Sequence, residues 1–142
     1  MSRCEGLLKI SVEAGTAGRE EAFKQAILAA RAHPEKGQRP SVESVLHGLI
    51  PCRYVVHTHP WTANLLSCCE QGEAAARELF GEDVLWVPYI EPGYLLANQI
   101  VKLLRAYEKK TGRAWPRAVL MQSHGFIVAG DSAEEVISRV LR

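Results

Sequence analysis

The sequence has few features that would place it outside the class of ordinary globular domains. It contains no run of apolar residues long enough to cross a bilayer. Arg3, Glu5 and Lys9 place three charges among the first ten residues, which argues against a signal peptide. Its 17 basic and 16 acidic side chains leave a net charge of +1, so it has no overall field that would attract nucleic acid or an anionic membrane. We therefore expect a small-molecule partner, with no nucleic acid and no membrane.

Cysteine is also scarce, since the chain contains only four, and no two of them form a C-x-x-C pair. Cys4, Cys52, Cys68 and Cys69 fall in apolar, periodic segments rather than in a loop-rich, disulfide-bonded scaffold. This pattern predicts reduced thiols and a cytoplasmic protein. A redox role for the adjacent pair Cys68 and Cys69 is open, but packing as small buried hydrophobes is favoured.

The length and composition are those of one domain. The chain has 142 residues, 47% of them apolar, and no internal repeat or long linker, which predicts a single α/β domain over residues 1–142. Apolar periodicity and Gly/Pro punctuation predict helices at residues 19–33, 41–49, 60–72, 73–80, 94–111 and 131–142. The last of these begins with a capping-box-like sequence, so Asp131 is its expected N-cap. The same reasoning predicts strands at residues 53–58, 84–90, 118–121 and 126–129, the first of them buried.

Two histidines at the end of the first predicted strand form the sharpest chemical feature. Residues two apart on a strand project from one face with Cα atoms about 6.6 Å apart, so His57 and His59 can approach one ion. His124 lies between two predicted strands and before a glycine, where a loop can turn its side chain into a cleft. Taken alone, the H-x-H pattern is also compatible with buried histidines that only satisfy hydrogen bonds.

Two polar residues open the predicted helix at residues 41–49. Glu43 is expected in its first turn, where a carboxylate complements the helix dipole without any catalytic role, and His47 follows on the same face. Ser41 is the expected N-cap, and a serine at such a position can also bind an anion. The functional interpretation therefore depends on the joint pattern of motifs along the chain.

Four motifs, in this order and spacing, resemble the class II aldolase and adducin family. They are P-S-V-E-S-V-L-H at residues 40–47, V-V-H-T-H-P at residues 55–60, V-P-Y followed by P-G within residues 87–93, and S-H-G at residues 123–125. The similarity covers about residues 39–131 and is greatest to rhamnulose-phosphate-aldolase-like members.

The resemblance implies a three-layer α/β/α fold with a mixed, largely antiparallel central sheet. It further implies Zn²⁺, or another divalent transition metal, ligated by His57, His59 and His124, with Glu43 as the catalytic carboxylate. The implied reaction is cleavage of a phosphorylated ketose, similar to rhamnulose 1-phosphate, through a metal-stabilised enediolate. A homo-oligomer, often a tetramer, is also implied. Epimerase or dehydratase activity on a sugar phosphate, or a non-catalytic interaction module similar to the adducin head, are the alternatives.

The resemblance is incomplete at the substrate phosphate. The N-terminal segment that supplies phosphate-binding loops in the family has no counterpart here, so we expect the domain to lack that segment. Where relatives of fuculose-phosphate aldolase carry two serines just before the carboxylate, this chain has Ser41 and Val42. Ser41 is therefore the one substrate-binding residue that the resemblance carries over.

Overall fold

The structure is a computed structural model that describes residues 16–141. The chain divides into two compact units, of which the first comprises Met1–Leu49 with Glu91–Asn98 and the second Ile50–Ile90 with Gln99–Arg142. The single domain expected over residues 1–142 stays a prediction. Among the described residues, no helix combines the length and the apolar character needed to span a membrane.

The first unit is helical. It contains α2 (Thr16–Ala29), the 3₁₀ helix η1 (Pro34–Lys36), α3 (Ser44–Leu49) and the beginning of α6 (Tyr94–Thr111). Phe23 of α2 is fully buried and packs edge-on against the ring of Tyr94, with the ring centroids 5.6 Å apart. The apolar stripe predicted for this helix is thus the face that it buries, although α2 begins and ends earlier than expected.

The second unit is built on one four-stranded sheet in the order β1-β4-β3-β2. Its strands are β1 (Tyr54–Thr58), β2 (Val84–Val87), β3 (Ala118–Met121) and β4 (Gly125–Gly130). Two of the strand pairs, β1 with β4 and β3 with β4, are antiparallel, and β2 pairs with β3 in parallel. The predicted α/β class with a mixed, mostly antiparallel sheet is confirmed.

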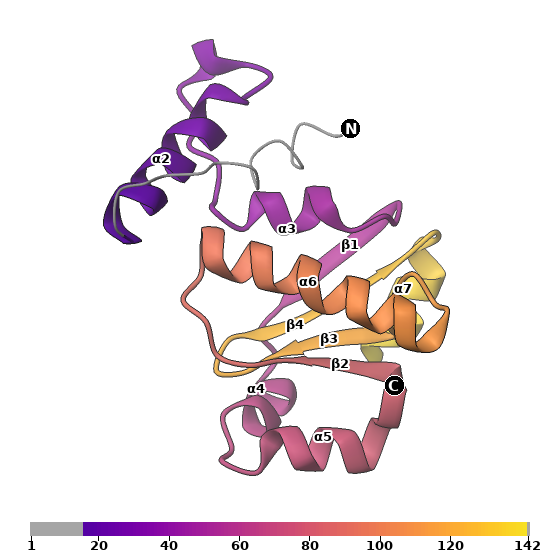
Figure 1. Cartoon of the computed structure of the whole chain (residues 1–142). Coiled ribbons are helices and arrows are strands. Elements are labelled where there is room, and N and C mark those ends of the chain that lie inside the picture. The colour runs from indigo at the N-terminus through magenta and orange to yellow at the C-terminus, as the bar shows by residue number, and fades with distance from the viewer. Residues whose placement is uncertain (1–15, 142) are drawn as a thin grey trace. The chain divides into compact units, whose positions relative to one another are not determined.

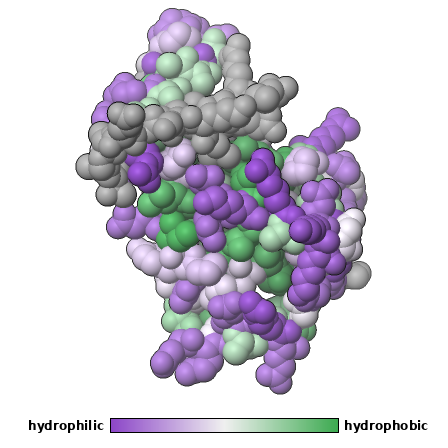
Figure 2. All heavy atoms as spheres, viewed as in Figure 1, coloured by the Kyte–Doolittle hydropathy of each residue, from purple (hydrophilic) through white to green (hydrophobic). Residues whose placement is uncertain are grey.

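Helices flank this sheet, as Figure 1 shows. On one face, Trp86 and Leu120 form a cluster with Ala76 of α5 (Gly72–Phe80), and Leu66 of α4 (Trp61–Ser67) packs against it. α7 (Ala133–Leu141) packs against β4 and β1. The outer surface of α5 is largely hydrophilic in Figure 2, and Arg77 and Glu78 are exposed there.

The register places the first metal-ligand candidate on the opposite face. His57 pairs with Ile127, which pairs with Val119, so these three side chains share one side of the sheet. Ile127 and Val119 are almost fully buried. In the view of Figure 1, α6 runs in front of the sheet, and its Ile100 and Leu104 are also buried.

Three expectations are corrected by the structure. Residues 53–58 were expected to form a buried strand, but β1 lies at the edge of the sheet and its side chains are half-buried or exposed. The thiols of Cys68 and Cys69 are exposed, because α4 ends at Ser67 and the pair lies in the turn that follows. Helix α7 is capped one residue later than expected, with the Ser132 hydroxyl accepting a hydrogen bond from Glu135 N.

Candidate metal site

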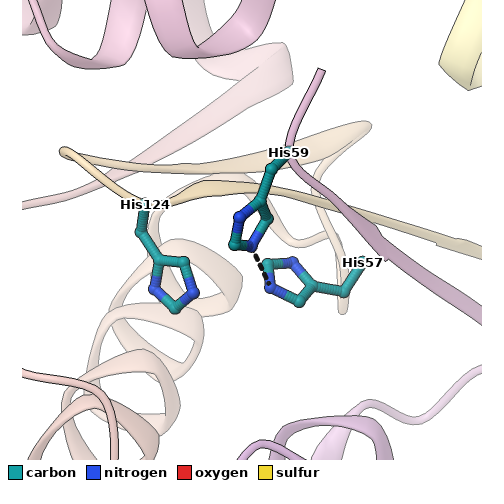
Figure 3. Close-up of side chains that lie close together, drawn as sticks. All are labelled: His57, His59 and His124. Carbon is teal, nitrogen blue, oxygen red and sulfur yellow. Dashed lines mark hydrogen bonds between the residues drawn. The ribbon is translucent and has the colours of Figure 1, made fainter. Parts of the chain in front are cut away.

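The end of β1 brings two imidazole rings together. His57 is in the strand and His59 follows its last residue, so both rings extend from the same side of the chain (Figure 3). Their Nε2 atoms are 3.0 Å apart and their ring centroids 4.7 Å apart. His57 is half-buried and His59 is exposed. The two rings thus approach each other as the H-x-H pattern predicts, although His59 lies one residue beyond the strand.

The turn between β3 and β4 supplies the third ring. The centroid of His124 lies 5.1 Å from that of His57 and 4.9 Å from that of His59, and Figure 3 shows the three rings facing a common centre. One nitrogen atom from each ring lies within 4.8 Å of the others. His57 Nδ1 also lies 3.0 Å from Phe126 O, a residue 69 positions away in sequence, because β1 and β4 are neighbours in the sheet.

Backbone hydrogen bonds hold this turn in place. Ser123 adopts a left-handed conformation (φ +55°), and its N–H donates to the carbonyl oxygen of the buried Ser67 at 3.1 Å. The N–H of His124 donates to Met121 O at 3.2 Å. An L-residue in this region is uncommon and persists only where its surroundings fix it. The position of His124 is thus set by the end of α4 as well as by the sheet.

The V-P-Y motif at residues 87–89 has a structural role beside the same turn. Gln122 precedes Ser123, and its N–H donates to Val87 O at 2.9 Å. Its side-chain Oε1 accepts a hydrogen bond from Tyr89 N at 3.0 Å. These two bonds hold the segment after β2 against the turn that carries His124.

The hydrogen bonding of His57 suits a metal ligand. Its Nδ1 lies 3.0 Å from Phe126 O, and since a carbonyl oxygen can only accept, the ring proton resides on Nδ1 and the lone pair on Nε2. Ligating histidines commonly donate their second nitrogen in this way. The Nε2 atoms of His57 and His59, 3.0 Å apart, share a hydrogen bond (Figure 3), and since His57 Nε2 carries the lone pair, His59 Nε2 is the donor. A bound cation would take the place of that proton.

The donor set fits a divalent transition metal. Bonds of about 2.0–2.1 Å in a tetrahedral arrangement place two ligand nitrogens about 3.3 Å apart, close to the distance between His57 and His59. Three histidines leave further coordination positions for a substrate. The described residues therefore contain a three-histidine cluster that can hold a metal ion.

The other two expected site residues, Ser41 and Glu43, lie in the first unit, whereas the histidines lie in the second. Glu43 directly precedes α3 rather than occupying its first turn, so that expectation is corrected. Ser41 is not the expected N-cap of a longer helix: its hydroxyl oxygen accepts a hydrogen bond from Glu43 N at 3.1 Å, in a local turn. Their roles beside the histidines stay predictions.

Ser41 lines an open pocket of about 710 Å³ within the first unit. Lys24 of α2 and Arg39 also line it, together with the carboxylate-bearing Glu21. Neither cation was predicted as a binding residue, because Lys24 lies 17 positions before Ser41, in α2, and Arg39 lies outside the four motifs. The basic residue just before Pro40 was the available signal.

Comparison with known proteins identifies the family and the fold. The model of the class II aldolase and adducin N-terminal domain matches residues 9–141. A protein named uncharacterized oxidoreductase YuxG, from Bacillus subtilis (strain 168), is 31% identical over 106 residues, which are 75% of this chain and 14% of that protein.

A solved structure shares the fold. The N-terminal class II aldolase domain of a conserved protein from Thermoplasma acidophilum superposes with a TM-score of 0.75 at 22% identity, covering 96% of this chain and 57% of the other. This chain therefore spans only part of both matched proteins.

Proposed function

The chain belongs to the class II aldolase and adducin family, and from this premise we propose that it acts as a metal-dependent lyase. The proposed substrate is a phosphorylated ketose similar to rhamnulose 1-phosphate. The observation that carries the proposal is the convergence of His57, His59 and His124, whose ligand atoms lie within 4.8 Å of one another. Zn²⁺ is the proposed ion, because three imidazole ligands suit it well.

Each residue has a defined part in this proposal. His57, His59 and His124 hold the ion, and the Phe126 carbonyl keeps His57 in the tautomer that binds it. A divalent ion bound there polarises the oxygen atoms of a hydroxyketone and stabilises negative charge that develops on them. Glu43 provides the carboxylate that accepts and returns a proton while the carbon–carbon bond breaks.

We further propose that the substrate phosphate binds near Ser41. The hydroxyl group of Ser41 and the cationic side chains of Lys24 and Arg39 line one pocket, and phosphate oxygens accept hydrogen bonds from all three groups. The family also leads us to propose a homo-oligomer, which sedimentation analysis of the purified chain would test.

The decisive experiment is an aldol cleavage assay with a panel of ketose 1-phosphates. We expect release of dihydroxyacetone phosphate and an aldehyde, loss of turnover when a chelator removes the ion, and recovery when Zn²⁺ is restored. A His124→Ala variant should be inactive, whereas His33→Ala, which alters an exposed histidine paired with Glu35, should keep full activity. Metal-independent cleavage, or none with any ketose phosphate, would contradict the proposal.

An oxidoreductase activity is the second candidate, because the Bacillus relative carries that name. That name describes a protein of which this chain matches 14%, so the activity belongs to this chain only as a proposal. Including NAD⁺ and NADP⁺ in the same assay separates the two candidates. Reduction of the nicotinamide together with oxidation of the sugar phosphate would favour the second.

A further inference from the structure

Gly125, the first residue of β4, borders the space that His59 occupies. A Cβ atom added at Gly125 would lie 2.5 Å from Cδ2 of His59, 3.1 Å from its Nε2 and 2.6 Å from the carbonyl oxygen of Thr58. Carbon atoms in favourable contact are about 3.5–4.0 Å apart. The φ angle of Gly125 is not positive, so this glycine is required for space and not for backbone conformation.

Neither neighbour can yield while the histidine cluster stays intact. The Thr58 oxygen belongs to the backbone of β1, and Thr58 is the register partner of Phe126, the residue after Gly125. The ring of His59 can turn away, but it then loses its position 3.0 Å from His57 Nε2. A side chain at Gly125 would thus displace a candidate metal ligand and also press on the β1 backbone at Thr58.

We propose that Gly125 is a positioning residue of the metal site. Its missing side chain allows the ring of His59 to stand beside that of His57, and the next residue, Phe126, orients His57 through its carbonyl oxygen. The first two residues of β4 therefore determine the positions of both rings of the H-x-H pair. This inference rests on the proposed metal binding.

The test is the affinity of purified variants for Co²⁺, measured by titration and by the visible spectrum of the bound ion. Gly125→Ala should bind Co²⁺ roughly 10- to 100-fold more weakly, with an altered spectrum, as found when the supports of metal ligands are removed. Gly130→Ala is the matched control in the same strand, because its Cβ would lie 2.6 Å from the Glu135 carboxylate, a similarly short contact that involves no histidine of the cluster. It should bind Co²⁺ as the wild type does.

The outcomes separate this inference from the proposed function. If the wild type binds Co²⁺ and Gly125→Ala has the same affinity and spectrum, the positioning role is wrong while the metal site stands. If the wild type binds no Co²⁺, the metal site itself is wrong.

A second measurement covers the case in which Gly125→Ala folds poorly. Thermal unfolding is compared for Gly125→Ala, His59→Ala and the double variant. Since two of the three short contacts are with the His59 ring, the alanine at position 125 should destabilise the protein less when the ring is absent. Because the contact with the Thr58 oxygen remains, the double variant should regain only part of the stability that Gly125→Ala loses. Equal destabilisation in both backgrounds would contradict the inference.

Discussion

The carboxylate of Glu43 is the residue on which the proposed chemistry depends most. Replacing it with glutamine preserves size but removes the base, so Glu43→Gln should retain the metal and lose turnover by at least about 100-fold. Metal analysis and the aldol assay on one preparation check both parts. Turnover within a few-fold of the wild type would show that Glu43 is not the catalytic base. Loss of the metal would show instead that Glu43 helps to bind the ion.

Cysteine reactivity tests the exposure of the thiols. Burial raises the pKa of the Cys52 thiol, and the nearby Asp131 carboxylate raises it further. Less of Cys52 is therefore thiolate at neutral pH, and thiolate is the form that reacts. We expect iodoacetamide to modify the exposed Cys68 and Cys69 before Cys52. The difference between their rates of modification should narrow as pH rises, because more of Cys52 becomes thiolate. Timed labelling with peptide mass spectrometry measures this, and modification of Cys52 first would be contrary to the structure.

How far the sequence predicted the site differs from residue to residue. His57 and His59 were predictable because two-residue spacing on a strand fixes a common side, whatever the rest of the fold does. His124 followed from the family motif, since only the pairing of β1 with β4 brings it near the other two rings. Gly125 was noted only as the glycine after His124, and its closeness to the His59 ring was missed because it depends on the pairing of β1 with β4. The Phe126 carbonyl was missed because a backbone acceptor leaves no signature in residue type.

Among the elements, α7 offers a direct test of local structure. The Ser132 hydroxyl accepts a hydrogen bond from Glu135 N at 3.1 Å, and Glu135 in turn accepts one from Asp131 N at 2.9 Å. Ser132→Ala should lower the free energy of unfolding by about 1 kcal/mol, while Ser132→Asp, which can still cap, should change it little. Urea denaturation of the three proteins checks this. An equal loss in both variants would show that capping is not the cause.

The elements themselves were largely predictable, and so were those edges that a proline or glycine marks. β3 was predicted at Ala118–Met121 exactly where it lies, because an apolar run follows a proline-containing loop and precedes a turn. α6 ends at Thr111, as expected from the glycine that follows, and Gly112 adopts the left-handed conformation (φ +70°) typical of a helix end. α4 ended sooner than the apolar pattern suggested, because Ser67 bonds to the turn that carries His124. That tertiary contact exposed Cys68 and Cys69, and no local pattern could have predicted it.

At the scale of the whole molecule, the central claim is that this chain binds one divalent ion through three histidines. Ligands that bind only the folded state also stabilise it, so added Zn²⁺ should raise the unfolding temperature, and the shift should grow with the concentration of the ion. A three-histidine site gives this response only when all three rings converge, which requires β1 and the turn before β4 to fold together.

The most direct measurement is the metal content and Zn²⁺ affinity of the purified chain by elemental analysis and equilibrium dialysis. We predict about one equivalent of ion per chain, roughly 10- to 100-fold weaker binding or worse after alanine replaces any one of His57, His59 and His124, and unchanged binding for the control His33→Ala. A wild-type chain that holds well below one equivalent and takes up none, or binding that survives loss of all three histidines, would contradict the account.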